Sequence, residues 1–204
     1  MTTTISRLYN SHREARAAVR DLEAAGVNHG DISILVSNAD NSYDDKTGTF
    51  PDRDLDGTDD RAEAAGTGAG IGAVAGGTVG ALTGLGLLAI PGVGPIVAAG
   101  WLVATLTGAA AGAATGGLVG ALTQAGVSKE EADVYAEALR RGGALVSARV
   151  ADNDASRLQS IMDRSSVRLT DRAAAYRAGG WKSFDPAAAP YTPEQIRKER
   201  ELYR

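Results

Sequence analysis

"TTISRLYNSHREARAAVRDLEAAGVNHGDISILVS" spans residues 3 to 37 and contains two different hydrophobic periods. The runs at its two ends, TTISRLY and DISILVS, are short and rich in β-prone residues, which predicts strands. Ser11 and Glu14 form a capping-box pattern between these runs, and Gly26 is placed to end the helix that follows. The apolar positions of that helix recur at helical spacing: Ala15, Ala18, Val19 and Leu22. The segment therefore predicts a β-α-β unit.

A similar pattern returns after a long central insert. SKEEADVYAEALRRGG, residues 128 to 143, begins with Ser128 and Glu131 as a capping box and stops at Gly142. ALVSARV at 144–150 predicts a strand. DNDASRLQSIMDR then predicts a helix with Leu158, Ile161 and Met162 facing inward, and SVRLTDR at 166–172 predicts a last strand.

Joined across the insert, the two halves read β-α-β and α-β-α-β. This order predicts an α+β fold, specifically a ferredoxin-like sandwich split by a long excursion. A C-terminal helix is indicated by Thr192, Pro193 and Gln195, which are a cap, a first-turn proline and a third-position glutamine. The expected organisation is 1–38 and 129–172 for the two halves, 39–63 for an acidic flexible linker, 64–128 for the insert and 173–204 for a tail with a short helix.

The insert, residues 64 to 128, contains no Asp, Glu, Lys or Arg. The sequence IPGVGP in its middle must break a helix, so we expect two helices near 64–90 and 96–126, folded as a hairpin. Small residues at four-residue spacing let helix backbones approach closely, which predicts glycine-zipper packing and assembly. The glycines of these two stripes are Gly68, Gly72, Gly76, Gly80, Gly84, Gly100, Gly108, Gly112, Gly116 and Gly120.

The faces opposite the glycines are also apolar, so a lone hairpin would have no face suited to water. Lipid or other copies of the chain must cover it, and the sequence leaves both open. The tip, with Pro91, Val93 and Pro95, has no polar residue. We expect it to lie farthest from the α+β domain, buried within a bilayer or at the centre of an oligomer, with both halves of that domain on the cytoplasmic side of any membrane.

Three stretches of the sequence carry a resemblance to a known family, and the match covers nearly the whole chain. They are TTTISRLYNSHREARAAVRDLEAAGV, the insert from GAGIGAVAGG through LAIPGVGPIVAAGWL to GLVGALTQAGV, and EEADVYAEALRRGGALVSARV. In these segments the chain resembles the general stress protein 17M-like (YflT-type) family of bacterial stress and low-temperature-induced proteins. The resemblance implies a bacterial, stress-associated, non-enzymatic protein. It supplies no catalytic residues.

DRDLDGTDDRAE, residues 52 to 63, matches the spacing of an EF-hand calcium loop. Its candidate Ca²⁺ ligands are Asp52, Asp54, Asp56, Thr58, Asp60 and Glu63. No helix signal precedes the loop and no second loop pairs with it, so an Asp-rich linker that meets the pattern by composition is the alternative. No other cofactor is expected.

Net charge is −4, which gives no general attraction to nucleic acid, and the chain has no cysteine. His12 and His29 lack partners in sequence for catalysis or metal binding and are expected at the surface, as are Arg140, Arg141 and Arg200. The leading hypothesis is a cytoplasmic, non-enzymatic interaction protein that forms homo-oligomers through the glycine-rich hairpin and contacts membrane. The alternative is a binding module for a ligand or ion, with the sheet face or the Asp-rich loop as its site.

Overall fold

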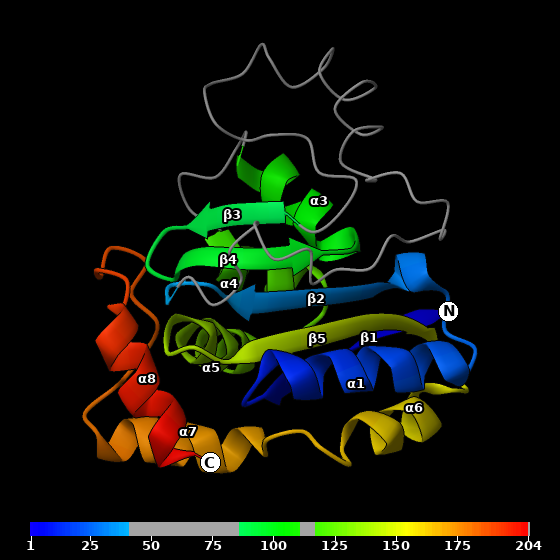
Figure 1. Ribbon diagram of the computed structural model, residues 1–204. Coiled ribbons are helices and arrows are strands. Elements are labelled where there is room, and N and C mark those ends of the chain that lie inside the picture. Colours follow the sequence, from blue (N-terminus) through cyan, green and yellow to red (C-terminus); the bar gives the residue numbers. More distant parts are fainter. Residues whose placement is uncertain (41–85, 111–116, 204) are drawn as a thin grey trace, which may run out of the picture.

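The computed structural model describes residues 1–40, 86–110 and 117–203 (Figure 1). Its strands are β1 (Thr2–Tyr9), β2 (Ile32–Ser37), β3 (Gly86–Ile90), β4 (Gly94–Ala99) and β5 (Ala144–Ala151). Its helices are α1 (His12–Ala24), the short 3₁₀ helix η1 (His29–Asp31), α3 (Trp101–Ala110), α4 (Gly117–Gln124), α5 (Lys129–Arg140), α6 (Ala155–Met162), α7 (Leu169–Ala178) and α8 (Pro193–Leu202).

The strands form a five-stranded sheet in the order β1-β5-β2-β4-β3, and every neighbouring pair is antiparallel. β5 lies between β1 and β2, so these two strands are parallel to each other and α1 crosses from one to the other. The pairing of Leu8 with Leu145, and of Leu145 with Leu35, aligns three leucines across the sheet on one face. The mixed α+β prediction is therefore confirmed.

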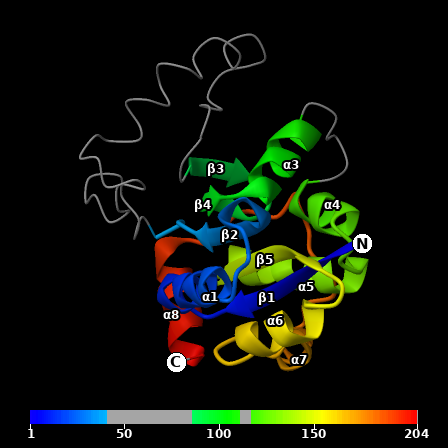
Figure 2. The ribbon, with the colours of Figure 1, turned by 90° about the vertical axis from the view of Figure 1, so that its right-hand side faces the viewer.

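Two hydrophobic cores lie on the two faces of this sheet. On one face, α1 and α6 pack through Ala15, Leu22, Leu158 and Met162. On the other, α3, α4, α5 and α7 cover the aligned leucines. Figure 2 shows α1 and α4 on opposite sides of the sheet. Alternate residues of β1, β2 and β5 serve the two cores, as the period-two geometry of a strand requires, whereas the core residues of β3 and β4 all belong to the second of these cores.

The predicted helix boundaries on both sides of the insert are confirmed. The Ser11 hydroxyl accepts a hydrogen bond from the Glu14 backbone N–H, and the Glu14 carboxylate accepts from the Ser11 backbone, which completes the capping box of α1. Ser128 caps α5 by accepting from the Glu131 backbone N–H, while the Glu131 carboxylate accepts from the Ser128 hydroxyl and not from its backbone. Thr192 and Gln195 form a second complete capping box at α8. These caps are local, which explains why they could be predicted from sequence.

The predicted helical hairpin is wrong where the structure describes it. Residues 86–90 and 94–99 are the strands β3 and β4, joined by a tight turn. The apolar residues of β4 find hydrogen-bond partners in β2, from the Ile34–Ala99 pair to the Ser37–Ile96 pair. Tertiary pairing thus overrides the four-residue glycine spacing that suggested a helix.

The second predicted helix, 96–126, is also wrong as one continuous element. Among the described residues it is replaced by the end of β4 and by α3 and α4, which pack against each other. Gly100 has a φ of +95°, so it lies in the turn between β4 and α3 rather than inside a helix. Gly117 has a φ of +45° at the start of α4, where regular helical geometry is also interrupted.

The predicted strand at 166–172 is reduced to one isolated bridge between Val167 and Leu8. Helix α7 begins at Leu169, within the predicted strand. Its sequence continues into Ala173 and two further alanines, which favour helix, and the polar–apolar alternation of the predicted strand ends at Thr170. The helix propensity of this region therefore outweighs its short strand-like pattern.

The apolar turn between β3 and β4 does not project from the fold. Val93 is fully buried and belongs to the core that contains Leu35 and Leu139, whereas Pro91 and Pro95 are exposed. Gly92 packs against the backbone of Asp185 and Pro186. The prediction that this tip lies farthest from the domain is therefore wrong, because the C-terminal segment covers it (Figure 1).

None of the helices in the described part of the chain is both long and apolar enough to cross a lipid bilayer.

Candidate functional site

Most of the predicted site residues lie outside the part of the chain that the structure describes. This holds for all six candidate calcium ligands between Asp52 and Glu63 and for the glycines from Gly68 to Gly84, together with Gly112 and Gly116. Within 1–40, 86–110 and 117–203, no group of three or more His, Cys, Asp or Glu residues is arranged to hold a metal ion. The calcium loop and these glycine contacts remain predictions.

The three remaining glycines of the predicted zipper differ in their surroundings. A Cβ at Gly100 would lie 2.1 Å from the Ile32 carbonyl oxygen, so this glycine allows a turn to approach β2. Gly108 lies in α3. Gly120 lies in α4, and no described atom is within 4 Å of the position of its Cβ. Gly100 therefore serves β-sheet packing, which corrects its assignment to a helix–helix stripe.

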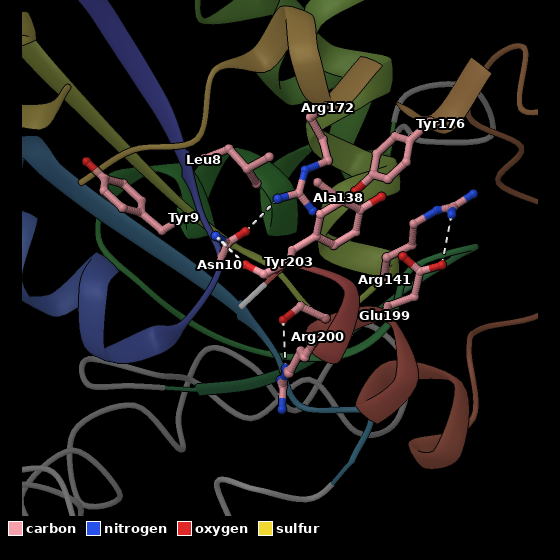
Figure 3. Close-up of a pocket in the computed structure, with 12 residues that line it drawn as sticks. Leu8, Tyr9, Asn10, Ala138, Arg141, Arg172, Tyr176, Glu199, Arg200 and Tyr203 are labelled. Atoms are coloured by element: carbon pink, nitrogen blue, oxygen red, sulfur yellow. Dashed lines mark hydrogen bonds and ion pairs between the residues drawn. The ribbon is translucent and has the colours of Figure 1, made fainter. Parts of the chain in front are cut away.

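The structure instead brings together residues from four distant segments around a small recess (Figure 3). The recess encloses about 290 Å³, including space open to solvent. The end of β1, the end of α5, α7 and α8 all contribute to its wall. Its lining residues are Leu8, Tyr9, Asn10, Ala138, Arg141, Gly142, Gly143, Arg172, Tyr176, Glu199, Arg200 and Tyr203.

Arg141 is the charged centre of the α5 side of the recess. Its Nε donates to Glu137 Oε1 at 2.6 Å and its Nη1 donates to Glu199 Oε1 at 3.0 Å. The fully buried Glu137 also forms an ion pair with Arg140, with 2.8 Å between Oε2 and Nη2. Burial alone would lower the pKa of Arg141, but the hydrogen bond to Glu137 and the negative charges around the guanidinium together raise it above its usual value. Two arginines on one buried carboxylate fix this corner of α5.

Arg172 faces the recess from α7 and is 9% exposed. Its Nη2 donates to Asn10 Oδ1 at 2.5 Å. The guanidinium lies over the Tyr203 ring, 3.6 Å from the ring centroid, and 5.9 Å from that of Tyr176. Asn10 in turn donates from Nδ2 to the Tyr203 carbonyl oxygen at 3.2 Å. Arg172 is therefore oriented by an amide and by two aromatic rings.

Arg200 attaches α8 to the body of the fold. Its Nε donates to the Gly142 carbonyl oxygen at 3.1 Å, and its Nη1 contacts the Asp40 carboxylate. Gly142 has a φ of +96°, and a Cβ there would lie 2.6 Å from the Ile196 side chain. The glycine that ends α5 thus also makes room for α8.

Two polar groups of the recess are unusual, the Tyr176 hydroxyl in its pKa and the Glu199 carboxylate in its hydrogen bonding. Burial raises the pKa of the Tyr176 hydroxyl well above its usual range, although Arg172 and Arg141 act in the opposite direction. Glu199 Oε2 is buried without a hydrogen-bond partner among the described residues. The tyrosine therefore stays neutral at physiological pH, and the recess retains an acceptor that is not saturated.

The recess was not predicted from the sequence, which indicated solvated helix faces for Arg140, Arg141 and Arg200. The signal available was the pair of arginines three and four residues after Glu137 on a helix whose other positions are mostly apolar. Arg172 carried no such signal, because its partners come from residues near both ends of the chain.

No family model matches this chain, and no curated protein or solved structure is significantly similar to it. The fold and the recess define its class: a mixed α+β protein with helices on both faces of an antiparallel sheet and a small cavity lined by arginines and tyrosines. The family resemblance described above stays a prediction.

Proposed function

We propose that this chain is a non-enzymatic interaction protein of the bacterial stress-response type, which forms homo-oligomers and contacts membrane through its uncharged segment. The observation that supports this most directly is the edge of the sheet. The last strand in the sheet order, β3, is Gly-Leu-Leu-Ala-Ile, and among the described residues it pairs only with β4. An apolar edge strand without charged residues is a typical site for pairing with another chain.

The sequence next to this edge supports the same proposal. Residues 64–85 lead directly into β3 and contain no charged residue. They carry five glycines at four-residue spacing, the pattern that lets helices approach closely in membranes and in assemblies. Part of the uncharged segment belongs to the folded core, since β4 is a strand of the sheet and α3 packs against the sheet. The proposed contacts with other copies and with lipid therefore belong to residues 64–90.

We also propose that β1, α1, β2, β5 and α6 form a split ferredoxin-like unit. Two facts support this: β5 lies between β1 and β2 and is antiparallel to both, and α1 and α6 share one face. The fourth strand of such a unit would lie beside β1, where Val167 makes a single bridge to Leu8. The insert then extends the sheet on the far side of β2.

Sedimentation velocity without detergent tests the assembly. We expect the wild type to sediment as an oligomer, and the double variant Gly76→Leu with Gly80→Leu to shift to smaller species, because leucine side chains would separate closely packed backbones. Gly77→Leu with Ala81→Leu adds similar bulk one position away from the spacing and serves as the matched control. A monomeric wild type would contradict the proposal.

Cosedimentation with liposomes tests the membrane contact separately. Wild-type protein is expected in the lipid pellet and the double variant is expected to be depleted from it. An oligomer that stays in the supernatant would support the proposed assembly and contradict the proposed membrane contact.

A further inference from the structure

The arginine-lined recess plays no part in the proposed assembly. Its three arginines differ in whether a carboxylate lies close to them. Arg141 is neutralised by Glu137 and Glu199, and Arg200 by Asp40. Arg172 differs from both: among the residues that the structure describes, no carboxylate lies within ion-pair distance of it.

A buried guanidinium without a counter-charge is costly, because burial removes most of its hydration. The Tyr203 ring offsets part of that cost through a cation–π contact, and the Asn10 amide oxygen and the Tyr176 hydroxyl do so through hydrogen bonds. A guanidinium carries five N–H donors, so these partners do not use its full capacity. Positive charge and donor capacity therefore remain at the wall of the recess.

From this arrangement we propose that the recess binds a small oxyanion, the carboxylate or phosphate group of a small ligand. Arg172 supplies the main charge and planar N–H donors, which match the oxygen pairs of both groups. Arg141, already paired with Glu137 and Glu199, also lines the recess, while the Tyr176 and Tyr203 rings provide apolar sides (Figure 3).

The site joins segments that are far apart in sequence. Asn10 follows β1, Arg141 follows α5, Arg172 belongs to α7 and Tyr203 follows α8. These groups are brought together only in the folded chain, so the anion should bind the folded state and stabilise it. Binding would also hold α8 against the body of the protein.

Isothermal titration calorimetry of the full chain with inorganic phosphate, and separately with acetate, at constant ionic strength tests this proposal. We expect saturable binding of at least one of the two anions. Stronger binding of phosphate would assign a phosphate-bearing ligand, and stronger binding of acetate a carboxylic acid. Absence of saturable binding for both would overturn the proposal.

Arg172→Gln should weaken the preferred anion at least about tenfold, because it removes a charged donor. Arg177→Gln is the matched control: it removes the same charge from an exposed position on the same helix. Binding by the control should be unchanged. Equal weakening in both variants would show a general charge effect and overturn the site.

Glu199→Gln provides a test that does not depend on the stability of the Arg172 variant. The carboxylate of Glu199 lines the recess and competes for Arg141, so its neutralisation should tighten anion binding by roughly threefold or more. A misfolded protein would not gain affinity. Unchanged or weaker binding in this variant would count against the proposal.

Discussion

Glu137 and His12 show how burial determines the state of single residues in this fold. Glu137 is fully buried, yet it stays compensated because Arg140 and Arg141 both reach it from the same helix. For His12, at the start of α1, burial disfavours the charged form. Burial and the nearby Arg16 lower its pKa from the usual 6.5 to about 4. The two residues illustrate a buried charge that is paired and a titratable group kept neutral.

The pKa of His12 predicts a pH dependence of stability. Between pH 6.5 and about 4, the unfolded chain takes up a proton at this residue while the folded protein does not. Stability contributed by neutral His12 is therefore present above pH 6.5 and is lost as the pH falls toward 4. In His12→Gln, urea unfolding should show a smaller decrease in the free energy of unfolding over this window than in the wild type. The same decrease in both proteins would contradict the assignment.

Short glycine turns decide how the elements pack. Gly100, between β4 and α3, has a φ of +95° and places its Cα where any side chain would meet β2. Here Ser33 makes the connection: its hydroxyl donates to the Ala99 carbonyl oxygen at 3.0 Å and accepts from the Leu102 backbone N–H at 2.9 Å. The start of α3 is therefore attached to β2 through one buried serine and one glycine.

Gly100→Ala is expected to destabilise the fold by roughly 2 kcal/mol or more, since it combines a left-handed backbone with a clash. Gly26→Ala is the control, because Gly26 has a φ of +93° but no atom within 4 Å of its Cβ position. Gly26→Ala should lower the free energy of unfolding only by the strain of placing alanine in a left-handed backbone conformation. Midpoints of denaturant unfolding measure both, and equal losses would show that the contact with β2 is not close.

At the scale of the whole molecule, the C-terminal segment closes the fold around the β3–β4 turn and the end of α5. Gly94 packs against Pro190, Gly142 packs against Ile196, and Arg141 forms an ion pair with Glu199. Ile196 is fully buried although it lies close to the end of the chain. The tail is thus part of the core that contains Val93, and the apolar turn is enclosed within the protein.

This enclosure predicts the effect of a charge at the turn. Val93→Asp should lower the stability of the entire fold by about 3 kcal/mol or more, since the carboxylate would be buried without a partner. Ala89→Asp places the same charge at an exposed position of the same hairpin and should have little effect. Thermal unfolding followed by circular dichroism compares the two variants. If both unfold at the wild-type temperature, Val93 is accessible to water.

The sequence by itself determined the local elements outside the insert. The capping boxes at Ser11 and Thr192, the helical spacing of α1 and the β-prone run of β5 depend on neighbours within a few residues, and all were predictable. The mixed α+β class followed from their order.

Only the tertiary structure decided the insert and the recess. Residues 86–99 became strands because β2 offers hydrogen bonds to β4, a contact that joins positions about sixty residues apart in the chain. Arg172 meets Asn10 and Tyr203 from opposite ends of the sequence, and no local pattern encodes such a meeting. Spacing within a segment predicts which face is apolar, but the partner of that face is selected by the free energy of the whole fold.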